Sequence, residues 1–600
     1  MRLFGFAGHW PDSAAQSTQS CHAPQLETQA GVTVALEGGP VWLAGVEVAE
    51  LPAAAILQAY RTKSRRCLDD LSGRFALAII DRPSDRVLLA VDRAGIERLA
   101  YATFGQGIVF SSSVANVAGF AGLSAPLRPQ ALFDYLLLHM VPAPETVYAG
   151  VFKLRPGTCA TFEQGRLTVE RYWTPEFTQG RGESFATLRE GLHASLRGAV
   201  EACRPDEQTG AFLSGGLDSS TVTGLLSRVT GRPPHTFSIG FGIDEYDELK
   251  YAHIASRHFG ALPYEYYVTP DDVVEAFPKI AAAFDEPFGN SSAVPTYFCA
   301  QLAVQHGITQ LLAGDGGDEL FGGNERYARQ RIFEAYSAVP ATVRSQLIEP
   351  LVARIDPESR ITPLRKLRSY VDQARIPMPE RLESWNFIYR TDLAAMLDPG
   401  FRDSIDTRTP LRTMAEVFAS GPGRTLLQRL LFYDWHYTLS DNDLRKVGAM
   451  CELAGSRVSY PMLDPRVVDV SLRVPPRMMM RGLELRSFYK HAMRGFLPDE
   501  ILAKKKHGFG LPFGLWLKTH ARLGELIYGL LSELKSRGIV KSRFLDTLIA
   551  DHRLGHSGYY GYAIWDLAML EAWLQQHAAL TVRQPWACAA GSFAACANHT

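Results

Sequence analysis

The sequence predicts an α/β protein in two parts, a β-rich N-terminal region and a parallel-sheet region that continues into a helical extension. Short apolar runs broken by turns fill the chain up to about Trp173. Strands then alternate with helical periodicity over residues 211–312, and helical patterns prevail from about 329 to 580. The 600 residues also exceed what one hydrophobic core usually holds, so we expect at least two domains.

The N-terminal region is predicted to be built from strands. Its clearest strand candidates are residues 75–81, 86–92 and 107–111, each apolar and bounded by turn residues. A polar, glycine-containing stretch from Thr174 to Glu183 is typical of a linker. It predicts a boundary between the two parts of the chain.

The region after the linker alternates between strand and helix. Ala211-Phe212-Leu213 is a short buried strand, and apolar residues at helical spacing follow it at Val222, Leu225, Leu226 and Val229. The same order recurs with a strand at 236–240, a helix at 249–259 and a strand at 308–312. This alternation predicts a parallel sheet, which binds ligands at the carboxyl ends of its strands.

These patterns divide the chain into three stretches. We expect one domain over residues 1–175, a second over residues 185–580, and a loosely ordered tail over residues 581–600.

Composition and charge exclude several classes of function. The 63 acidic and 62 basic residues nearly cancel, so no global field attracts nucleic acid or an anionic membrane. No apolar run reaches the roughly 18 residues of a membrane span, and the N-terminal stretch lacks a signal-peptide pattern. The eight cysteines form no CxxC pair and no zinc-type cluster. We therefore expect a cytoplasmic protein with reduced thiols and no nucleic-acid or membrane partner.

The first motif that indicates chemistry is Ser214-Gly215-Gly216-Leu217-Asp218-Ser219-Ser220, between a predicted strand and a predicted helix. Glycines let backbone N–H groups approach an anion, and a helix directs its positive end at the same place. The two serines add hydroxyl donors, and Asp218 is a candidate magnesium ligand. The motif lacks the spacing and the lysine of GxxxxGK[ST], which excludes that phosphate loop.

A second motif, Gly314-Asp315-Gly316-Gly317-Asp318-Glu319, changes the interpretation of the first. Taken alone, a Ser-Gly-Gly turn is most often a plain turn. Here, three acids also follow a buried strand in a glycine-rich loop. Two acid-bearing loops at the ends of two parallel strands predict a shared site for a metal ion and a polyphosphate.

With these and three further segments, Phe237 to Gly240, Asp285-Glu286-Pro287 and Lys504 to Pro512, the chain resembles the asparagine synthetase superfamily over roughly residues 3–578. The resemblance implies an N-terminal glutaminase-like (Ntn-type) β-rich sandwich domain. It also implies a C-terminal ATP-pyrophosphatase (adenine nucleotide α-hydrolase-like) parallel-sheet domain with a helical extension.

The resemblance further implies that a carboxylate attacks ATP to give an acyl-adenylate, which an amine then attacks. The cofactors would be ATP and Mg²⁺, with Asp218 and Asp318 as metal ligands. The implied nucleotide-binding residues are Leu213, Ser214, Gly215, Gly216, Asp218, Ser219, Ser220, Ile239 and Gly314. Lys506, Glu452 and Asp315 are the candidate catalytic residues, and the neighbouring Lys504 and Lys505 are expected to be solvated charges.

Three positions depart from the glutamine-dependent members of the superfamily. Those members carry a nucleophilic cysteine after the initiator methionine, where this chain has Arg2. Their oxyanion-stabilising asparagine matches Ala44, and the aspartate that holds the glutamine amine matches Ser72. We therefore expect no glutaminase activity, with the fold kept as a scaffold.

The C-terminal half is most similar to the lasso-peptide cyclase (macrolactam synthetase) branch. The segments Asn442 to Gly455 and Tyr460 to Asp464 replace the pattern of asparagine synthetases, and Arg457 stands where those carry a glutamate. Glu452 has two interpretations: a base for the attacking amine, or an ion-pair partner of Arg445 or Lys446.

The leading hypothesis is a macrolactam synthetase. It would adenylate an Asp or Glu side chain of a precursor peptide, whose own N-terminal amine then closes the ring. A leader peptidase or leader-binding protein is the expected partner. The alternatives are an ammonia-dependent asparagine synthetase, another small-molecule amide ligase such as a β-lactam synthetase-like enzyme, and a non-catalytic scaffold.

Overall fold

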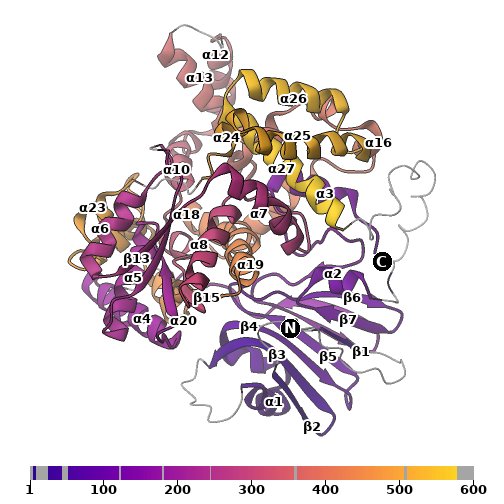
Figure 1. The fold of residues 1–600 in the computed structure, drawn as a ribbon, viewed down its shortest axis with the longest axis vertical. Coiled ribbons are helices and arrows are strands. Elements are labelled where there is room, and N and C mark those ends of the chain that lie inside the picture. The colour runs from indigo at the N-terminus through magenta and orange to yellow at the C-terminus, as the bar shows by residue number, and fades with distance from the viewer. Residues whose placement is uncertain are drawn as a thin grey trace.

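The computed structural model describes residues 4–7, 25–42, 52–120, 123, 125–178, 182–243, 245–356, 361–505 and 510–577. Among these residues, the N-terminal half forms two antiparallel sheets (Figure 1). The six-stranded sheet has the order β10 (Arg166–Arg171), β9 (Thr158–Glu163), β5 (Arg86–Val91), β4 (Leu71–Asp81), β3 (Val32–Trp42) and β2 (Gln25–Gln29). The four-stranded sheet has the order β1 (Phe4–Ala7), β7 (Gly107–Ser111), β6 (Ala100–Phe104) and β8 (Phe152–Lys153).

The two sheets pack face to face because side chains alternate along each strand. In β5, Leu89 joins Ile108 of β7 in the core between the sheets. Its neighbour Leu88 points to the other face and joins Ile56 of helix α1 (Pro52–Lys63). The expected β-rich sandwich is therefore confirmed, with a covering helix that the strand patterns did not predict.

The C-terminal half contains a parallel sheet, as predicted. Among the described residues its order is β13 (Leu262–Tyr267), β12 (His235–Gly240), β11 (Thr209–Phe212), β14 (Gln310–Leu312) and β15 (Arg457–Ser459). Helices α4 (Phe185–Ala202), α5 (Leu217–Thr230) and α6 (Leu249–Phe259) pack together along one side of it (Figure 1). Helices α7 (Pro270–Ala283), α8 (Ala293–Gln305) and α19 (Arg445–Ala454) form the other layer.

The order of the strands creates one point where the chain changes direction across the sheet. From β11 the chain moves outward through β12 to β13, and it then returns to the opposite side of β11 to form β14. The segments that follow β11 and β14 therefore diverge and leave a crevice between them. Ligands of open α/β sheets bind at such a point, beyond the carboxyl ends of the strands.

The remainder of the C-terminal half is mainly helical, as expected. Its longer helices are α10 (Glu325–Ser337), α13 (Thr362–Arg375), α17 (Thr409–Ser420), α18 (Leu426–Asp434), α25 (Ala521–Leu534), α26 (Ser542–Leu554) and α27 (Ser557–Gln576). Within the described parts of the chain, no helix is both long enough and apolar enough to cross a bilayer.

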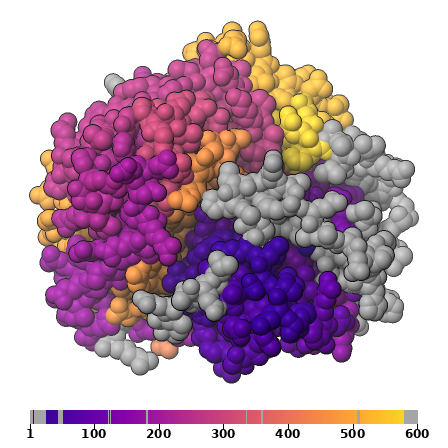
Figure 2. Space-filling view, turned by 60° about the horizontal axis from the view of Figure 1, so that its bottom comes forward, coloured from indigo at the N-terminus to yellow at the C-terminus, as the bar shows by residue number. Residues whose placement is uncertain are grey.

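The two halves share an extensive interface. Figure 2 shows the indigo N-terminal half bordering the magenta and orange surface of the C-terminal half. The Tyr135 hydroxyl of α3 (Pro129–Leu138) donates to the Asp566 carbonyl of α27 at 2.8 Å. Both helices also contribute to one continuous hydrophobic core.

A buried ion-pair cluster lies at this interface. The carboxylate of Glu286 is fully buried and accepts from Lys153 Nζ of β8 at 2.7 Å and from Arg445 Nη1 of α19 at 2.9 Å. Burial alone would raise the pKa of Glu286, but the two cations hold it below its ordinary value. Glu286 thus connects the smaller N-terminal sheet to the first turn of α19.

We expect the substitution Glu286→Gln to destabilise the fold by about 3–5 kcal/mol, because it removes the carboxylate that pairs with both buried cations. The measurement is the urea midpoint of unfolding, followed by tryptophan fluorescence. Glu201→Gln is the matched control, since Glu201 forms an exposed pair with Arg197 whose loss costs at most about 1 kcal/mol. Equal shifts for the two variants would contradict the structural role of Glu286.

Candidate functional site

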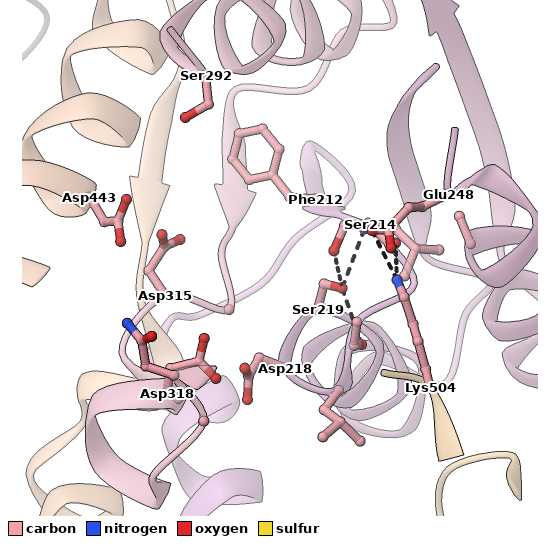
Figure 3. A pocket seen from close by; sticks show the side chains of 18 of the residues that line it. Phe212, Ser214, Asp218, Ser219, Glu248, Ser292, Asp315, Asp318, Asp443 and Lys504 are labelled. Carbon is pink, nitrogen blue, oxygen red and sulfur yellow. Dashed lines mark hydrogen bonds and ion pairs between the residues drawn. The ribbon is translucent and has the colours of Figure 1, made fainter. Parts of the chain in front are cut away.

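A cavity of about 900 Å³ lies at the carboxyl ends of β11 and β14. Figure 3 shows acidic side chains on one side of it and the Ser214 turn on the other. Its polar lining residues include Ser214, Asp218, Ser219, Glu248, Asn290, Ser292, Asp315, Asp318, Glu319, Asn324, Glu325, Asp443, Lys446, Glu484, Arg486, Lys490, Lys504 and Lys505. The site therefore forms where the strand order predicts a ligand crevice.

The turn after β11 depends on Gly215. This residue has φ +68°, and a Cβ on it would lie 2.4 Å from the Ala252 nitrogen of α6. The backbone can therefore pass this closely only with glycine. Ser214 N donates to Ser219 Oγ at 3.3 Å, and α5 begins directly afterwards at Leu217. The N-terminus of α5 thus faces the cavity, as an anion-binding helix requires.

The loop after β14 lies directly against this turn. A Cβ on Gly314 would come within 2.8 Å of Ser219 N, and one on Gly317 within 2.1 Å of Asp218 Oδ1. Because both positions are glycine, the two loops can make direct contact. The structure thus brings together the two motifs that the sequence assigned to one site.

The structure places most of the predicted site residues in this cavity. Those that line it are Leu213, Ser214, Gly216, Asp218, Ser219, Ile239, Gly314, Asp315 and Asp318. Gly215 shapes the turn from behind the cavity wall, and Ser220 is buried within α5. Lys506, together with Arg2 and Ala44, lies outside the described residues.

Glu452 is not brought to this cavity. It is an exposed residue of α19, outside the cavity lining, so the structure offers no support for its assignment as the base. The alternative ion pairs are also absent from the described structure, because Arg445 pairs with Glu286 and Lys446 with Asp443. The reason is geometric: Glu452 follows Lys446 by six residues, and at about 100° per residue this turns it away from the cavity.

Asp315, Asp443 and Lys446 form a charged group on the cavity wall. Lys446 Nζ donates to Asp443 Oδ1 at 2.8 Å. Burial raises the pKa of Asp315 to about 7, with Lys446 acting in the opposite direction. Burial disfavours the charge of Lys446, yet Asp443 and Asp315 hold its pKa above the ordinary value. At neutral pH, Asp315 is therefore a carboxyl group poised to exchange a proton beside a permanent cation.

Arg486 is a site residue that the sequence motifs did not identify. Its guanidinium lies between the two predicted metal ligands. Nη2 donates to Asp218 Oδ1 at 2.5 Å, and Nη1 donates to Asp218 Oδ2 at 2.5 Å and to Asp318 Oδ1 at 3.2 Å. Asp218 and Asp318 thus share one position for a positive charge.

The position between Asp218 and Asp318 is suited to a magnesium ion that phosphate oxygens also coordinate. In the described part of the chain, no three His, Cys, Asp or Glu side chains are grouped as a metal site. Mg²⁺, however, usually takes one or two carboxylates and completes its coordination with phosphate oxygens and water. Asp218 and Asp318 supply such a pair beside the anion-binding turn at Ser214.

Lys504 was expected to be a solvated charge, and the structure shows otherwise. Its side chain is only 8% exposed, and Nζ lies 3.1 Å from Glu248 Oε2 (Figure 3). The same ammonium donates to the carbonyls of Ser214 and Gly215, each at 3.4 Å, and lies over the Tyr251 ring. Lys504 therefore anchors the Ser214–Gly215 turn, which is the candidate anion-binding element.

We expect Lys504→Met to weaken the binding of inorganic pyrophosphate by about tenfold, because the turn loses a charged anchor worth about 1.5 kcal/mol. Isothermal titration calorimetry measures this change. Lys535→Met is the matched control, since Lys535 forms an ion pair with Asp546 on the surface. Unchanged pyrophosphate affinity in Lys504→Met would refute the anchoring role.

Comparisons with known proteins agree with this architecture. The family model for asparagine synthase matches residues 191–575, and the model for a glutamine amidotransferase domain matches residues 52–173. Asparagine synthetase [glutamine-hydrolyzing] 1 of Bacillus subtilis is 26% identical over 500 residues, which cover 83% of this chain and 76% of that protein.

Two further relatives carry similar names. A putative asparagine synthetase [glutamine-hydrolyzing] of Mycobacterium tuberculosis is 26% identical over 557 residues, covering 92% of this chain and 81% of the relative. Putative asparagine synthetase [glutamine-hydrolyzing] 2 of Methanocaldococcus jannaschii is 32% identical over 273 residues, covering 45% of this chain and 53% of the relative. Since the first family model alone spans well over half of the sequence, the chain belongs to the asparagine synthase family.

Proposed function

We propose that this chain is an ATP-dependent carbon–nitrogen ligase that forms an amide bond through an acyl-adenylate and releases AMP and pyrophosphate. The observation that carries the proposal is the contact between the two motif loops. It places Asp218 and Asp318 beside the anion-binding turn of Ser214 in one cavity. Membership of the asparagine synthase family supports the same chemistry.

In the first step, a substrate carboxylate attacks the α-phosphorus of ATP and pyrophosphate leaves. The Ser214–Gly216 turn and the N-terminus of α5 bind the departing pyrophosphate through backbone N–H groups. Asp218 and Asp318 would hold Mg²⁺, which would neutralise phosphate charge. Ile239 and Gly314, which line the cavity beside the turn, bind the nucleotide through their backbones.

In the second step, an amine attacks the acyl carbon and AMP leaves. The amine must lose a proton as the new C–N bond forms. Asp315 is the acceptor that the structure favours, since it lines the cavity and its pKa of about 7 matches neutral conditions. Lys446 stands beside it as a fixed positive charge. Asp315 thus takes the role that the sequence pattern had offered to Glu452.

We propose that the amine does not come from glutamine. Glutamine hydrolysis by this family type needs a thiolate nucleophile. Burial raises the pKa of Cys67 to about 12, of Cys159 to about 11, and of Cys203 and Cys451 to about 12. These thiols stay protonated at neutral pH, and Ser72 stands where a carboxylate would hold the glutamine amine. The same conclusion is expected from Arg2 and Ala44.

The proposed substrate is a precursor peptide that supplies both reacting groups. An Asp or Glu side chain is adenylated, and the N-terminal amine closes a macrolactam ring, as in lasso-peptide cyclases. The extent of the cavity supports a second substrate beside the nucleotide. Its lining extends beyond Asp318 to Asn324, Glu325, Leu483 and Glu484. A leader peptidase or leader-binding protein would supply the processed peptide.

The second candidate is an ammonia-dependent asparagine synthetase or another small-molecule amide ligase, including a β-lactam synthetase-like enzyme. What favours it is the name asparagine synthetase on relatives that align over most of this chain. The two candidates share the first step and differ in the amine and in the size of the carboxylate substrate.

Purified protein, ATP and Mg²⁺ with a peptide that has a free N-terminal amine and an Asp or Glu at ring-forming distance should give AMP and a product one water lighter. Mass spectrometry and AMP quantification measure both. Asparagine formed from aspartate and ammonium, without peptide cyclisation, would select the second candidate instead. Amide formation that requires glutamine would overturn the proposed nitrogen source.

We expect Asp315→Asn to lower the rate of amide formation by about 10²–10⁴-fold, the usual contribution of a general base. Substrate-dependent ATP–pyrophosphate exchange should stay within about tenfold of the wild type, because Asp315 acts after adenylation. In the wild type, the rate of amide formation from the adenylate should rise with pH through about 7 as Asp315 loses its proton, and the variant should lack this rise. Asp546→Asn, on the surface, is the control. Parallel loss of exchange and ligation would contradict the assignment.

A further inference from the structure

We propose that Arg486 is an internal counter-ion that occupies the metal position between Asp218 and Asp318 until a polyphosphate binds. The divalent ion then binds only together with the phosphate. The phosphate becomes the new partner of the Arg486 guanidinium, and the metal ion takes the position that the guanidinium leaves. The inference deepens the proposed function and rests on its metal–nucleotide site. It assigns to Arg486 an ordering role in substrate binding.

The contacts of Arg486 have the strength that such a role requires. Both terminal nitrogens donate to the two oxygens of Asp218, in the two-point geometry that suits a guanidinium and a carboxylate. Nη1 also reaches Asp318. One guanidinium therefore contacts both carboxylates at once, at the position proposed for the metal.

The rest of the Arg486 side chain is held in place by packing. The residue is 4% exposed, and its guanidinium lies 4.4 Å from the ring centre of Tyr489. The Tyr489 hydroxyl is in turn 2.9 Å from the Thr221 hydroxyl of α5. A Cβ on Gly323 would come within 2.8 Å of Arg486 Cδ, so the loop after β14 leaves space for this stem. The packing therefore fixes the Arg486 side chain in the site.

The Arg486 guanidinium has one donor that the two carboxylates do not use. Nε is buried and has no hydrogen-bond partner among the described residues. A buried donor without an acceptor is costly, so this nitrogen favours an additional oxygen atom. Arg486 also lines the cavity next to the anion-binding turn. In the proposed exchange, phosphate oxygens in the cavity would accept from Nε. They would also replace the carboxylates as the partners of Nη1 and Nη2.

Electrostatics then explain why the metal needs the phosphate. The Arg486 guanidinium already occupies the position that a divalent ion would take. If the ion entered alone, the two cations would repel each other strongly in this buried site. A polyphosphate supplies the negative charge that both cations need. The carboxylates pass to the metal and the guanidinium to the phosphate, so every charge keeps a partner.

Mn²⁺ is the probe for this exchange, with electron paramagnetic resonance reporting the loss of the free-ion signal on the full chain. We expect the wild type to bind Mn²⁺ at least tenfold more tightly with inorganic pyrophosphate than without it, after correction for the Mn²⁺–pyrophosphate complex. Arg486→Gln should bind Mn²⁺ without pyrophosphate at least tenfold more tightly than the wild type. Adding Asp218→Asn to this variant should remove the gain.

Arg522→Gln is the matched control, because Arg522 forms an exposed pair with Asp271 and lies outside the cavity lining. Tight Mn²⁺ binding by the wild type without pyrophosphate would overturn the inference, and this measurement needs no variant to fold. Equal Mn²⁺ affinity of the wild type and folded Arg486→Gln would overturn it too. The Mn²⁺ measurements do not depend on ligase activity. A negative ligase assay and a negative Mn²⁺ result can therefore be told apart.

Discussion

The backbone of Gly314 lies so close to that of Ser219 that a Cβ on Gly314 would come within 2.8 Å of the Ser219 nitrogen. This contact exists because β11 and β14 are neighbours in the sheet although about a hundred residues separate them along the chain. It sets the acids of one loop against the helix N-terminus that follows the other. Asp218 and Asp318 can then share a single cation, the Arg486 guanidinium, and the proposed anion-binding and metal-binding sides of the cavity face each other. Everything proposed about the chemistry depends on this approach of two glycine-rich backbones.

The N-terminal sandwich has a structural role that does not depend on glutamine chemistry. Its strand β8 places Lys153 against Glu286, and Glu286 binds Arg445 in the first turn of α19. The next residue of that helix is Lys446, which faces the cavity and pairs with Asp443 beside Asp315. Two adjacent residues of one helix therefore connect the domain interface to the reacting groups. A chain that lost the sandwich would expose the buried Glu286 cluster and release the helix that positions Lys446.

The sequence predicted those parts of the molecule that depend on local patterns. Helix α6 begins and ends at the predicted residues, and β7 matches residues 107–111. Strand β13 escaped prediction because Leu262–Tyr267 carries a proline and exposed side chains, so its pairing with β12 decides its structure. The motif loops were found because glycine and acid spacing is visible in sequence. Arg486 and Lys504 were not, because each contacts a loop more than 150 residues away. Glu452 lies outside the cavity lining because its position along the helix turns it away from the cavity.

In the proposed reaction, this chain activates a carboxylate by transferring AMP to it. The most direct test uses a substrate whose reacting carboxylate carries ¹⁸O at both oxygens, incubated with ATP and the purified protein. Acyl-adenylate chemistry transfers one carboxylate oxygen to the α-phosphorus, so mass spectrometry should find one ¹⁸O atom in each AMP that accompanies product. Label found in inorganic phosphate, or AMP released with product but without label, would contradict the account.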